Sequence, residues 1–217
     1  MSAEVAIDIR DVSKRFGPRW ALARLSYTLP VGRSLLLTGH NGSGKTTLLR
    51  MIATASFPTA GALVVLGNDS RAGRDTIRQQ VALLSHASFL YEDLTASQNL
   101  VILGRLMGLD NPHQAAAALL DRVGLSARTD NPVRQFSAGM RKRVAIARLL
   151  LKSPLLALLD EPFGELDPAG INQMEGLIAE LKAKGTTLVL ATHQVEQGIR
   201  LTEARLHLEN GRIAEAA

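Results

Sequence analysis

One short glycine-rich segment constrains the fold of this chain more than any other. Residues 39–46 read GHNGSGKT and match the pattern G-x-x-x-x-G-K-[ST], between an apolar run at 34–38 and an expected helix at 45–55. In this setting glycines let backbone N–H groups wrap phosphates, and the helix N-terminus adds partial positive charge. The alternative is a flexible Gly/Ser loop before an ordinary helix; such a match arises by chance on the order of once in a hundred chains. The motif therefore predicts a phosphate-binding loop without naming the nucleotide.

Apolar strands alternate with helices along the chain, and this alternation favours an α/β fold with a mainly parallel sheet. The first two segments, 5–12 and 25–29, alternate in the manner of antiparallel strands. A mostly helical stretch from 97 to 123, followed by a helix at 138–151, indicates a helical insertion. Further strands are expected at 34–38, 62–66, 81–85, 155–159 and 187–191, a helix at 168–184, and a last hairpin around Asn210-Gly211.

A second signal is the segment LLALLDEP at residues 155–162, in which an apolar strand ends in two carboxylates. A doubly wound sheet places its ligand chemistry at the carboxyl ends of its strands. There Asp160 suits a Mg²⁺ site, and Glu161 suits a base that polarises an attacking water. A strand that merely ends in surface charge is the alternative, and the glycine-rich loop makes it less favoured.

The segment ATHQ at 191–194 follows another predicted strand and carries His193 to the same edge of the sheet. A lone histidine is more often structural, but this position favours contact with a γ-phosphate. No Asn-Lys-x-Asp motif, which reads guanine, occurs in the chain. We therefore expect an adenine nucleotide.

Composition limits the partners. The formal charge is +5, from 25 Lys and Arg against 20 Asp and Glu, but the basic residues are scattered and aromatic residues make up only 4%. This pattern disfavours nucleic acid, which calls for clustered cations or several stacking rings. There is no cysteine, which excludes disulfides and cysteine-ligated metals. We see no signal peptide and no apolar run near the ~20 residues that span a bilayer, so any membrane part is expected in another chain.

Residues 136–151, FSAGMRKRVAIARLLL, combine a helix start with a basic cluster. Ser137 is a candidate N-cap, yet Arg141, Lys142 and Arg143 follow at the positive end of the helix dipole. Each exposed cation there costs roughly 0.3–1 kcal/mol. Either the three cations form a solvated face, or an anion is expected nearby.

The order of these motifs resembles the ATP-binding subunits of ABC transporters over nearly the whole chain. The resemblance implies a P-loop NTPase fold: a mainly parallel sheet core, an N-terminal antiparallel β subdomain and an inserted helical subdomain. We expect one ABC ATPase domain over 1–217, with its helical insert at approximately 87–150. It also implies ATP hydrolysis coupled to transport.

The resemblance assigns roles to individual residues. Catalysis falls to Glu161 as base, His193 as switch histidine and Lys45 of the Walker A loop. Metal binding falls to Thr46, Asp160 and His86. The residues implied to bind ATP are Phe16, Gly39, Asn41, Gly42, Ser43, Gly44, Lys45, Thr46, Thr47, Ser137 and Gly139. Phe16 stands where the family stacks an aromatic ring on adenine, with a core phenylalanine as the alternative.

The implied cofactors are ATP and Mg²⁺, and the implied partners are a second ATPase subunit, as a homodimer, and integral membrane subunits. Each ATP is then sandwiched between the Walker A loop of one copy and Ser137 and Gly139 of the other. The expected location is peripheral, on the cytoplasmic face of the inner membrane. The apolar residues Phe89, Leu90, Tyr91 and Leu94 either dock onto the membrane partner or pack inside the insert.

Several positions depart from the family pattern. His86 replaces the Q-loop glutamine and is titratable where glutamine is not. The signature carries Ala138 and Met140. The D-loop, residues 164–167, carries Glu165, an extra negative charge near the expected dimer seam.

The histidine at 86 and the FSAGM signature look most like the haem-exporter ATPase subunits of cytochrome c maturation. The ATPase subunit of another small exporter of drugs, lipids or polysaccharides is the rival. A non-transport ABC ATPase acting on nucleic acid is a third reading. The transported substrate does not contact this subunit in such systems, so the sequence does not name it.

Overall fold

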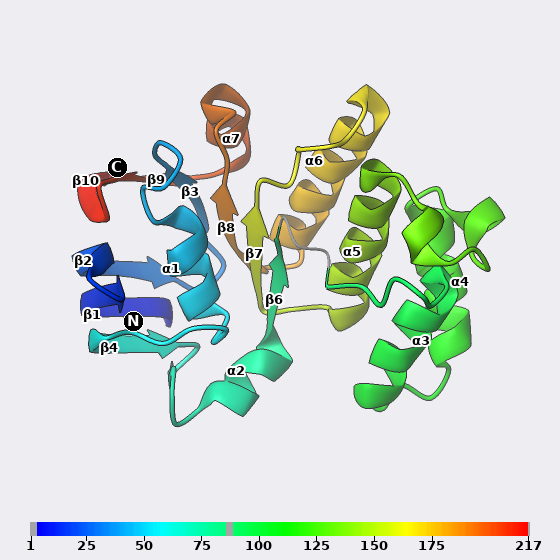
Figure 1. Ribbon diagram of the computed structural model, residues 1–217, viewed down its shortest axis with the longest axis horizontal. Coiled ribbons are helices and arrows are strands. Elements are labelled where there is room, and N and C mark those ends of the chain that lie inside the picture. The colour runs from blue at the N-terminus through cyan, green and yellow to red at the C-terminus, as the bar shows by residue number, and fades with distance from the viewer. Residues whose placement is uncertain (1–3, 86–88, 217) are drawn as a thin grey trace. The chain divides into compact units, whose positions relative to one another are not determined.

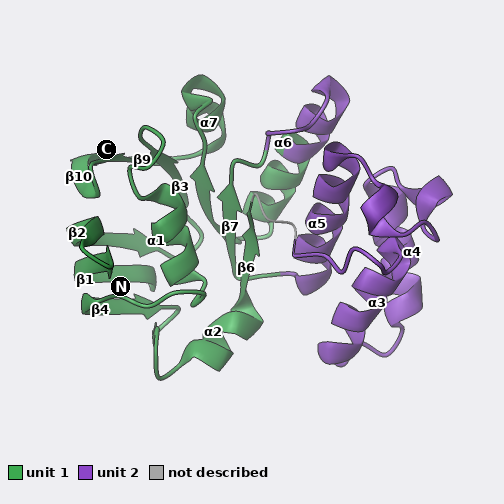
Figure 2. Cartoon of the chain, viewed as in Figure 1, with its two compact units in different colours: residues 1–85, 154–162, 175–217 green, residues 86–153, 163–174 purple. Residues whose placement is uncertain are grey.

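The computed structural model describes residues 4–85 and 89–216. Within it the chain divides into two compact units (Figure 2). Unit 1 comprises residues 1–85, 154–162 and 175–217, and unit 2 comprises 86–153 and 163–174. Unit 1 therefore contains the glycine-rich loop, the DE-terminated strand and the expected switch histidine, while unit 2 contains the signature segment.

Unit 1 has a six-stranded sheet in the order β10-β9-β3-β8-β7-β6 (Figure 1). Pairing is parallel from β9 across to β6, and β10 alone joins antiparallel. The central strands are buried along their whole length because helices and a second sheet cover their faces, as is typical of parallel sheets. The strands are β3 (Ser34–Thr38), β6 (Val81–Leu84), β7 (Leu156–Asp160), β8 (Thr187–Ala191), β9 (Ala204–Glu209) and β10 (Arg212–Ala216).

A second, antiparallel sheet in unit 1 has the order β2-β1-β4-β5. Strands β1 and β2 are long partners joined by a tight turn at Gly17-Pro18, and β1 also pairs with β4. The bounds are β1 (Val5–Phe16), β2 (Arg19–Pro30), β4 (Ala60–Val65) and β5 (Asn68–Asp69).

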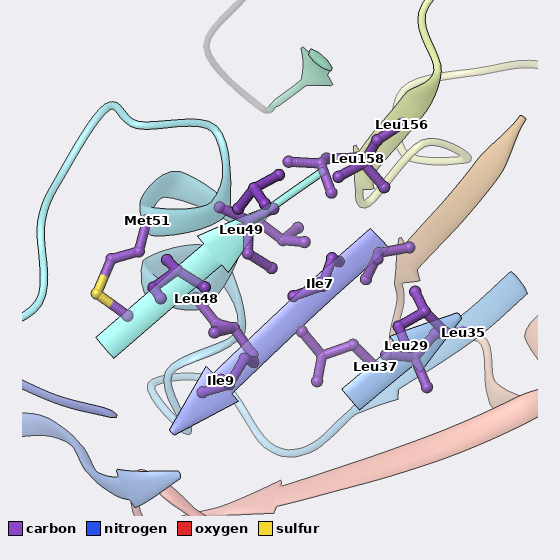
Figure 3. Packing of buried hydrophobic residues seen from close by; sticks show 14 of the residues in the cluster. Ile7, Ile9, Leu29, Leu35, Leu37, Leu48, Leu49, Met51, Leu156 and Leu158 are labelled. Carbon is purple, nitrogen blue, oxygen red and sulfur yellow. The ribbon is translucent and has the colours of Figure 1, made fainter. Parts of the chain in front are cut away.

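The main apolar core of unit 1 lies where side chains from the two sheets and from helix α1 (Lys45–Ile52) meet. Figure 3 shows Ile7 and Ile9 of β1 beside Leu48 and Leu49 of α1, with Leu158 of β7 in the same cluster. Because α1 contacts both β2 and β7, the helix that follows the glycine-rich loop is clamped between the two sheets. Burial of each of these side chains contributes roughly 1.5–3 kcal/mol.

Unit 2 is helical. Helix α5 (Ala138–Lys152) packs against α3 (Ala96–Leu106) and α4 (Pro112–Arg122). The start of α3 is fixed by a capping box, in which Thr95 and Gln98 exchange side-chain-to-backbone hydrogen bonds. Helix α4 begins with proline at its first position, where a missing N–H costs nothing. Two single 3₁₀ turns, Ser126–Arg128 and Val133–Gln135, connect α4 to α5.

Helix α6 (Pro168–Ala183) begins in unit 2 and continues in unit 1. Asp167 precedes it and accepts a hydrogen bond from the Gly170 N–H at 2.8 Å, so this carboxylate caps the helix. Among the described residues, no helix is long and apolar enough to cross a membrane.

The predicted α/β architecture is confirmed, and most expected elements occur within a few residues of their expected ends. Two short helices, α2 (Arg74–Gln80) and α7 (Val195–Leu201), were not expected, because seven residues carry too few apolar positions for a helical period to stand out. The last hairpin turns at Asn210 and Gly211, both with positive φ, as its Asn-Gly dipeptide predicts.

Candidate functional site

The glycine-rich loop is held in one conformation by close packing against neighbouring backbone. Gly44 has φ +111°, and a Cβ there would collide with the side chain of Leu22 and stand 2.9 Å from the Ala21 carbonyl oxygen. A Cβ on Gly39 would collide with the Leu208 carbonyl oxygen. Only glycine fits either position, which explains the loop's composition.

Lys45, the first residue of α1, curls back over the loop. Its Nζ donates to the carbonyl oxygens of Gly39 at 2.7 Å and His40 at 3.2 Å. The side chain is mostly buried. An ammonium group is thus fixed over the loop with neutral carbonyls as its hydrogen-bond partners, and an arriving phosphate would supply the opposite charge.

The loop encloses a cavity of about 190 Å³ whose lining includes Asn41, Gly42, Lys45, Thr46 and Thr47. Helix α1 opens onto it with no side-chain cap, so its first amides are available to an anion. The buried Ser43 Oγ accepts and donates no hydrogen bond among the described residues. Ser43 itself is not part of the cavity lining. A site with uncapped helix amides and an ammonium fits a phosphate group.

Strand β7 brings its terminal carboxylates to the same cavity. The Thr46 hydroxyl donates to Asp160 Oδ2 at 2.8 Å, and both Asp160 and Glu161 line the cavity. A hydroxyl and a carboxylate oxygen this close are the hard donors that Mg²⁺ prefers. The side chains present therefore fit a magnesium ion beside the phosphate site.

Glu161 is positioned by strand β8 and the residues that follow it. Its N–H donates to the Ala191 carbonyl at 2.8 Å, and its backbone takes the left-handed conformation with φ +48°. Nδ1 of His193 lies 2.9 Å from Glu161 Oε2, and the Thr192 hydroxyl donates to the same oxygen at 3.2 Å. The Glu161 side chain is about a quarter exposed, at 28%, so it also reaches water.

Phe16 lies at the end of β1 and is 55% exposed, which rules out the alternative of a core phenylalanine. The Lys14 ammonium stands 4.9 Å from the centroid of its ring, a cation–π contact. An exposed ring with a cation on one face can stack a purine on the other.

The predicted signature residues Ser137 and Gly139 lie in unit 2, so their placement is described within that unit alone. Ser137 caps α5, as predicted, by accepting from the Met140 N–H at 3.2 Å. A Cβ on Gly139 would stand 2.8 Å from the carbonyl oxygen of Glu165. The start of α5 thus fits directly against the D-loop.

The three cations at the start of α5 are each held or buried within unit 2. Arg141 donates to the Phe136 carbonyl at 2.7 Å, Arg143 pairs with Asp167 at 3.1 Å, and Lys142 is buried. They are therefore not a plain solvated face. The Gly170 N–H, and with it Arg143, lowers the pKa of the Asp167 carboxyl group from its ordinary value.

Sequence reasoning missed two residues of this site. Thr192 holds the Glu161 carboxylate, and Ala21 lines the phosphate cavity from β2. The only sequence signal for Thr192 was its place beside His193. No sequence pattern predicts that Ala21 lines the cavity, because strand β2 is brought to the loop by tertiary packing. His86, predicted as a metal ligand, lies outside the described residues.

Comparison with known proteins places the chain in a family. Residues 22–164 match the family described as "ABC transporter". The chain is 34% identical to Nod factor export ATP-binding protein I of Sinorhizobium fredii over 97% of this chain and 62% of that protein. It is 33% identical to the daunorubicin/doxorubicin resistance ATP-binding protein of Streptomyces peucetius over 96% of this chain and 64% of that protein. The chain thus spans less than two thirds of these two relatives.

A third relative is the glutamine transport ATP-binding protein of Escherichia coli, 34% identical over 96% of this chain and 90% of that protein. A solved structure of an ATP-binding subunit of an ABC transporter superposes with a TM-score of 0.90 at 29% identity, covering 98% of this chain and 89% of that one. A dimeric post-hydrolysis ATP-binding cassette bound to ADP and Pi shares the fold, with a TM-score of 0.90 at 24% identity and 97% of both chains covered. The chain therefore belongs to the ABC transporter family and is an ATP-binding domain with the ABC ATPase fold.

Proposed function

We propose that this chain is the ATP-hydrolysing motor subunit of a membrane ABC transporter that works as an exporter. The observation that carries the proposal is the cluster around one cavity in unit 1. There an ammonium, a hydroxyl–carboxylate pair and a glutamate–histidine pair converge on the carboxyl ends of parallel strands. Phosphoryl chemistry on a bound nucleotide needs these groups in this proximity.

Each group has one task in the proposed reaction. The loop amides and Lys45 bind the β- and γ-phosphates, and Phe16 stacks on adenine. Thr46 and Asp160 hold Mg²⁺, which would neutralise charge between the phosphates. Glu161 Oε2 orients the attacking water and accepts its proton, while His193 steers that carboxylate.

The proposal includes a second copy of the chain. In the proposed dimer, Ser137 and Gly139 of each copy would contact the γ-phosphate of the ATP that is bound to the other copy. A helix start with its backbone amides is suited to an anion. Bound ATP then joins the copies, and hydrolysis with product release lets them part.

The membrane partner would dock on unit 2. Phe89 and Tyr91 are 61% and 64% exposed, while Leu90 and Leu94 are half-buried. The Arg148 guanidinium donates to the Phe89 carbonyl at 2.8 Å and fixes this segment to α5. Two large exposed rings on an anchored segment suit a contact with integral membrane subunits, which would keep the chain peripheral on the cytoplasmic face of the inner membrane.

A Glu161→Gln variant tests the motor function. It should bind ATP and form a dimer in gel filtration with ATP, because ATP is no longer consumed, while Lys45→Ala should bind ATP poorly and remain monomeric. If the Glu161→Gln variant binds ATP but elutes only as a monomer, the two-copy arrangement is contradicted.

Export of haem for cytochrome c maturation is the finer proposal, and it rests on His86 and the 136–140 signature. Replacing the chromosomal gene by a Lys45→Ala copy should remove covalently bound haem from c-type cytochromes. Unchanged haem staining would favour another small exporter, a reading that the Nod factor and drug-resistance relatives support.

A role on nucleic acid is the remaining candidate. It would be favoured by salt-sensitive binding to RNA or DNA that raises ATP turnover. We expect neither effect from scattered cations and few aromatic residues.

A further inference from the structure

We propose that unit 1 carries a second ligand site, for an organic cation with an apolar body, at the amino ends of the central strands. A cavity of about 480 Å³ opens there, and its lining includes Leu155 just before β7 and Val31 just before β3. That volume lies within the range of small-molecule pockets. The site is separate from the proposed ATP hydrolysis and does not depend on it.

The cavity and the phosphate loop lie at opposite ends of the sheet's strands. Leu155 precedes β7 and lines the cavity, whereas Asp160 ends β7 and lines the phosphate site. Five residues of extended strand separate the two by about 16 Å. A ligand in this cavity would therefore leave the nucleotide site open.

The walls of the cavity are set by the main chain. The Leu155 N–H donates to the Gln80 carbonyl at 2.9 Å, and the Val31 N–H donates to the Glu4 carbonyl at 2.7 Å. These bonds join the segments before β7 and β3 to α2 and to the start of β1. The cavity is thus pre-formed, so a ligand would not have to order it.

Apolar side chains form much of the lining, and they are accessible. Val31 and Leu155 are 43% and 55% exposed, and Leu66 is half-buried. Partly exposed aliphatic groups gathered at one cavity favour a ligand that covers them, because each square ångström removed from water contributes about 25 cal/mol.

The charges of the lining are acidic. Among the described residues that line it, Glu4 and Asp8 are the ionisable ones. Asp8 is ion-paired with Arg10, whose Nε donates to it at 2.9 Å, so it adds little net charge. Glu4 has no side-chain partner among residues 4–85 and 89–216, and its carboxylate leaves a negative charge at the cavity. The potential at the cavity therefore favours a cation and opposes a nucleotide or another anion.

The wall also holds an unused acceptor. Gln80 Oε1 is buried, and no described residue donates a hydrogen bond to it. A buried acceptor without a donor costs roughly 1–3 kcal/mol, so a rotation of the Gln80 amide that brought Oε1 to a ligand N–H in the cavity would be favourable. An apolar body, a positive charge and an N–H donor together describe an organic ammonium compound.

Dansylcadaverine, a primary ammonium on an aromatic sulfonamide body, is the probe. Dansyl pentylamide, which lacks the ammonium, and dansyl-6-aminohexanoate, which is anionic, are its matched controls. Fluorescence titration of the purified chain should show saturable binding of dansylcadaverine, about fivefold tighter than the neutral probe and tighter still than the anion. Excess ATP with Mg²⁺ should not displace it.

Variants of the lining residues, each with a control in unit 2, test whether the probe binds in this cavity. Leu155→Arg puts a cation at the cavity and should weaken dansylcadaverine binding at least fivefold. Leu106→Arg, at an exposed leucine of unit 2, should leave it unchanged. Glu4→Gln with Asp8→Asn should remove the preference for the ammonium over the neutral probe, whereas Asp110→Asn, at an exposed acid of unit 2, should preserve it. Non-saturable binding, equal binding of all three probes, displacement by ATP, or insensitivity to Leu155→Arg would each overturn the proposal.

Discussion

His193 and Glu161 form a close side-chain pair, with Nδ1 of the histidine 2.9 Å from Oε2 of the glutamate. The histidine is exposed at 68% and the glutamate at 28%, so the pair faces water on one side. The Thr192 hydroxyl donates to the same oxygen. Oε2 is thus held by two groups from the loop after β8, which aims the carboxylate.

His193→Ala should lower ATP turnover by about 100-fold, because the proposed base loses the ring that orients it. ATP affinity should change less than threefold, since the loop and Lys45 do the binding. Steady-state hydrolysis and equilibrium binding of a fluorescent ATP analogue measure the two effects. Thr192→Val removes one donor and should give a smaller loss in the same direction; a His193→Ala enzyme as fast as wild type would contradict this role.

Thr46→Val should weaken ATP binding in the presence of Mg²⁺ by roughly tenfold, because it removes the hydroxyl that reaches Asp160 while keeping the side-chain shape. With EDTA present the variant and the wild type should bind ATP alike. Thr28→Val, at an exposed position on β2, is the matched control and should have no effect. An equal loss with and without Mg²⁺ would mean that Thr46 does not serve the metal.

Gly139→Ala should destabilise the chain by about 1–3 kcal/mol, because the new Cβ would stand 2.8 Å from the Glu165 carbonyl oxygen. Gly176→Ala is its control: this helical glycine has open space around it, and alanine there should stabilise by roughly 0.5–1 kcal/mol. Urea unfolding measures both. Two variants of equal stability would show that the D-loop does not abut α5.

Asp167→Asn should reveal a pH-dependent contribution to stability. Because the folded pKa of Asp167 is lowered, chiefly by the Gly170 N–H, its contribution is present above the unfolded pKa near 4 and is lost as pH falls through the lower folded value. The stability difference from wild type should be constant from pH 7 to 5 and shrink below pH 4. A difference that grows with acidity would reverse the assigned sign.

The features of the fold that could be predicted from the sequence are those set by residue types within one short segment. The loop between β3 and α1, the carboxylates after β7, the Ser137 cap and the Asn210-Gly211 turn each follow from residue types at fixed spacing. Sequence could not place Ala21 in the phosphate cavity, because only the packing of β2 against α1 brings it there. The partner of Arg143 was equally hidden, since Asp167 is brought to it by tertiary packing. The cavity at Leu155 has no motif at all, because its lining residues come from separate segments.

Hydrolysis of bound ATP by Glu161→Gln in a single turnover tests the central claim most directly. The variant should bind ATP as the wild type does and hydrolyse it at least about 100-fold more slowly, because glutamine cannot accept the proton of the attacking water. ATP turned over at the wild-type rate by a variant that binds it normally would contradict the role of Glu161 as the base.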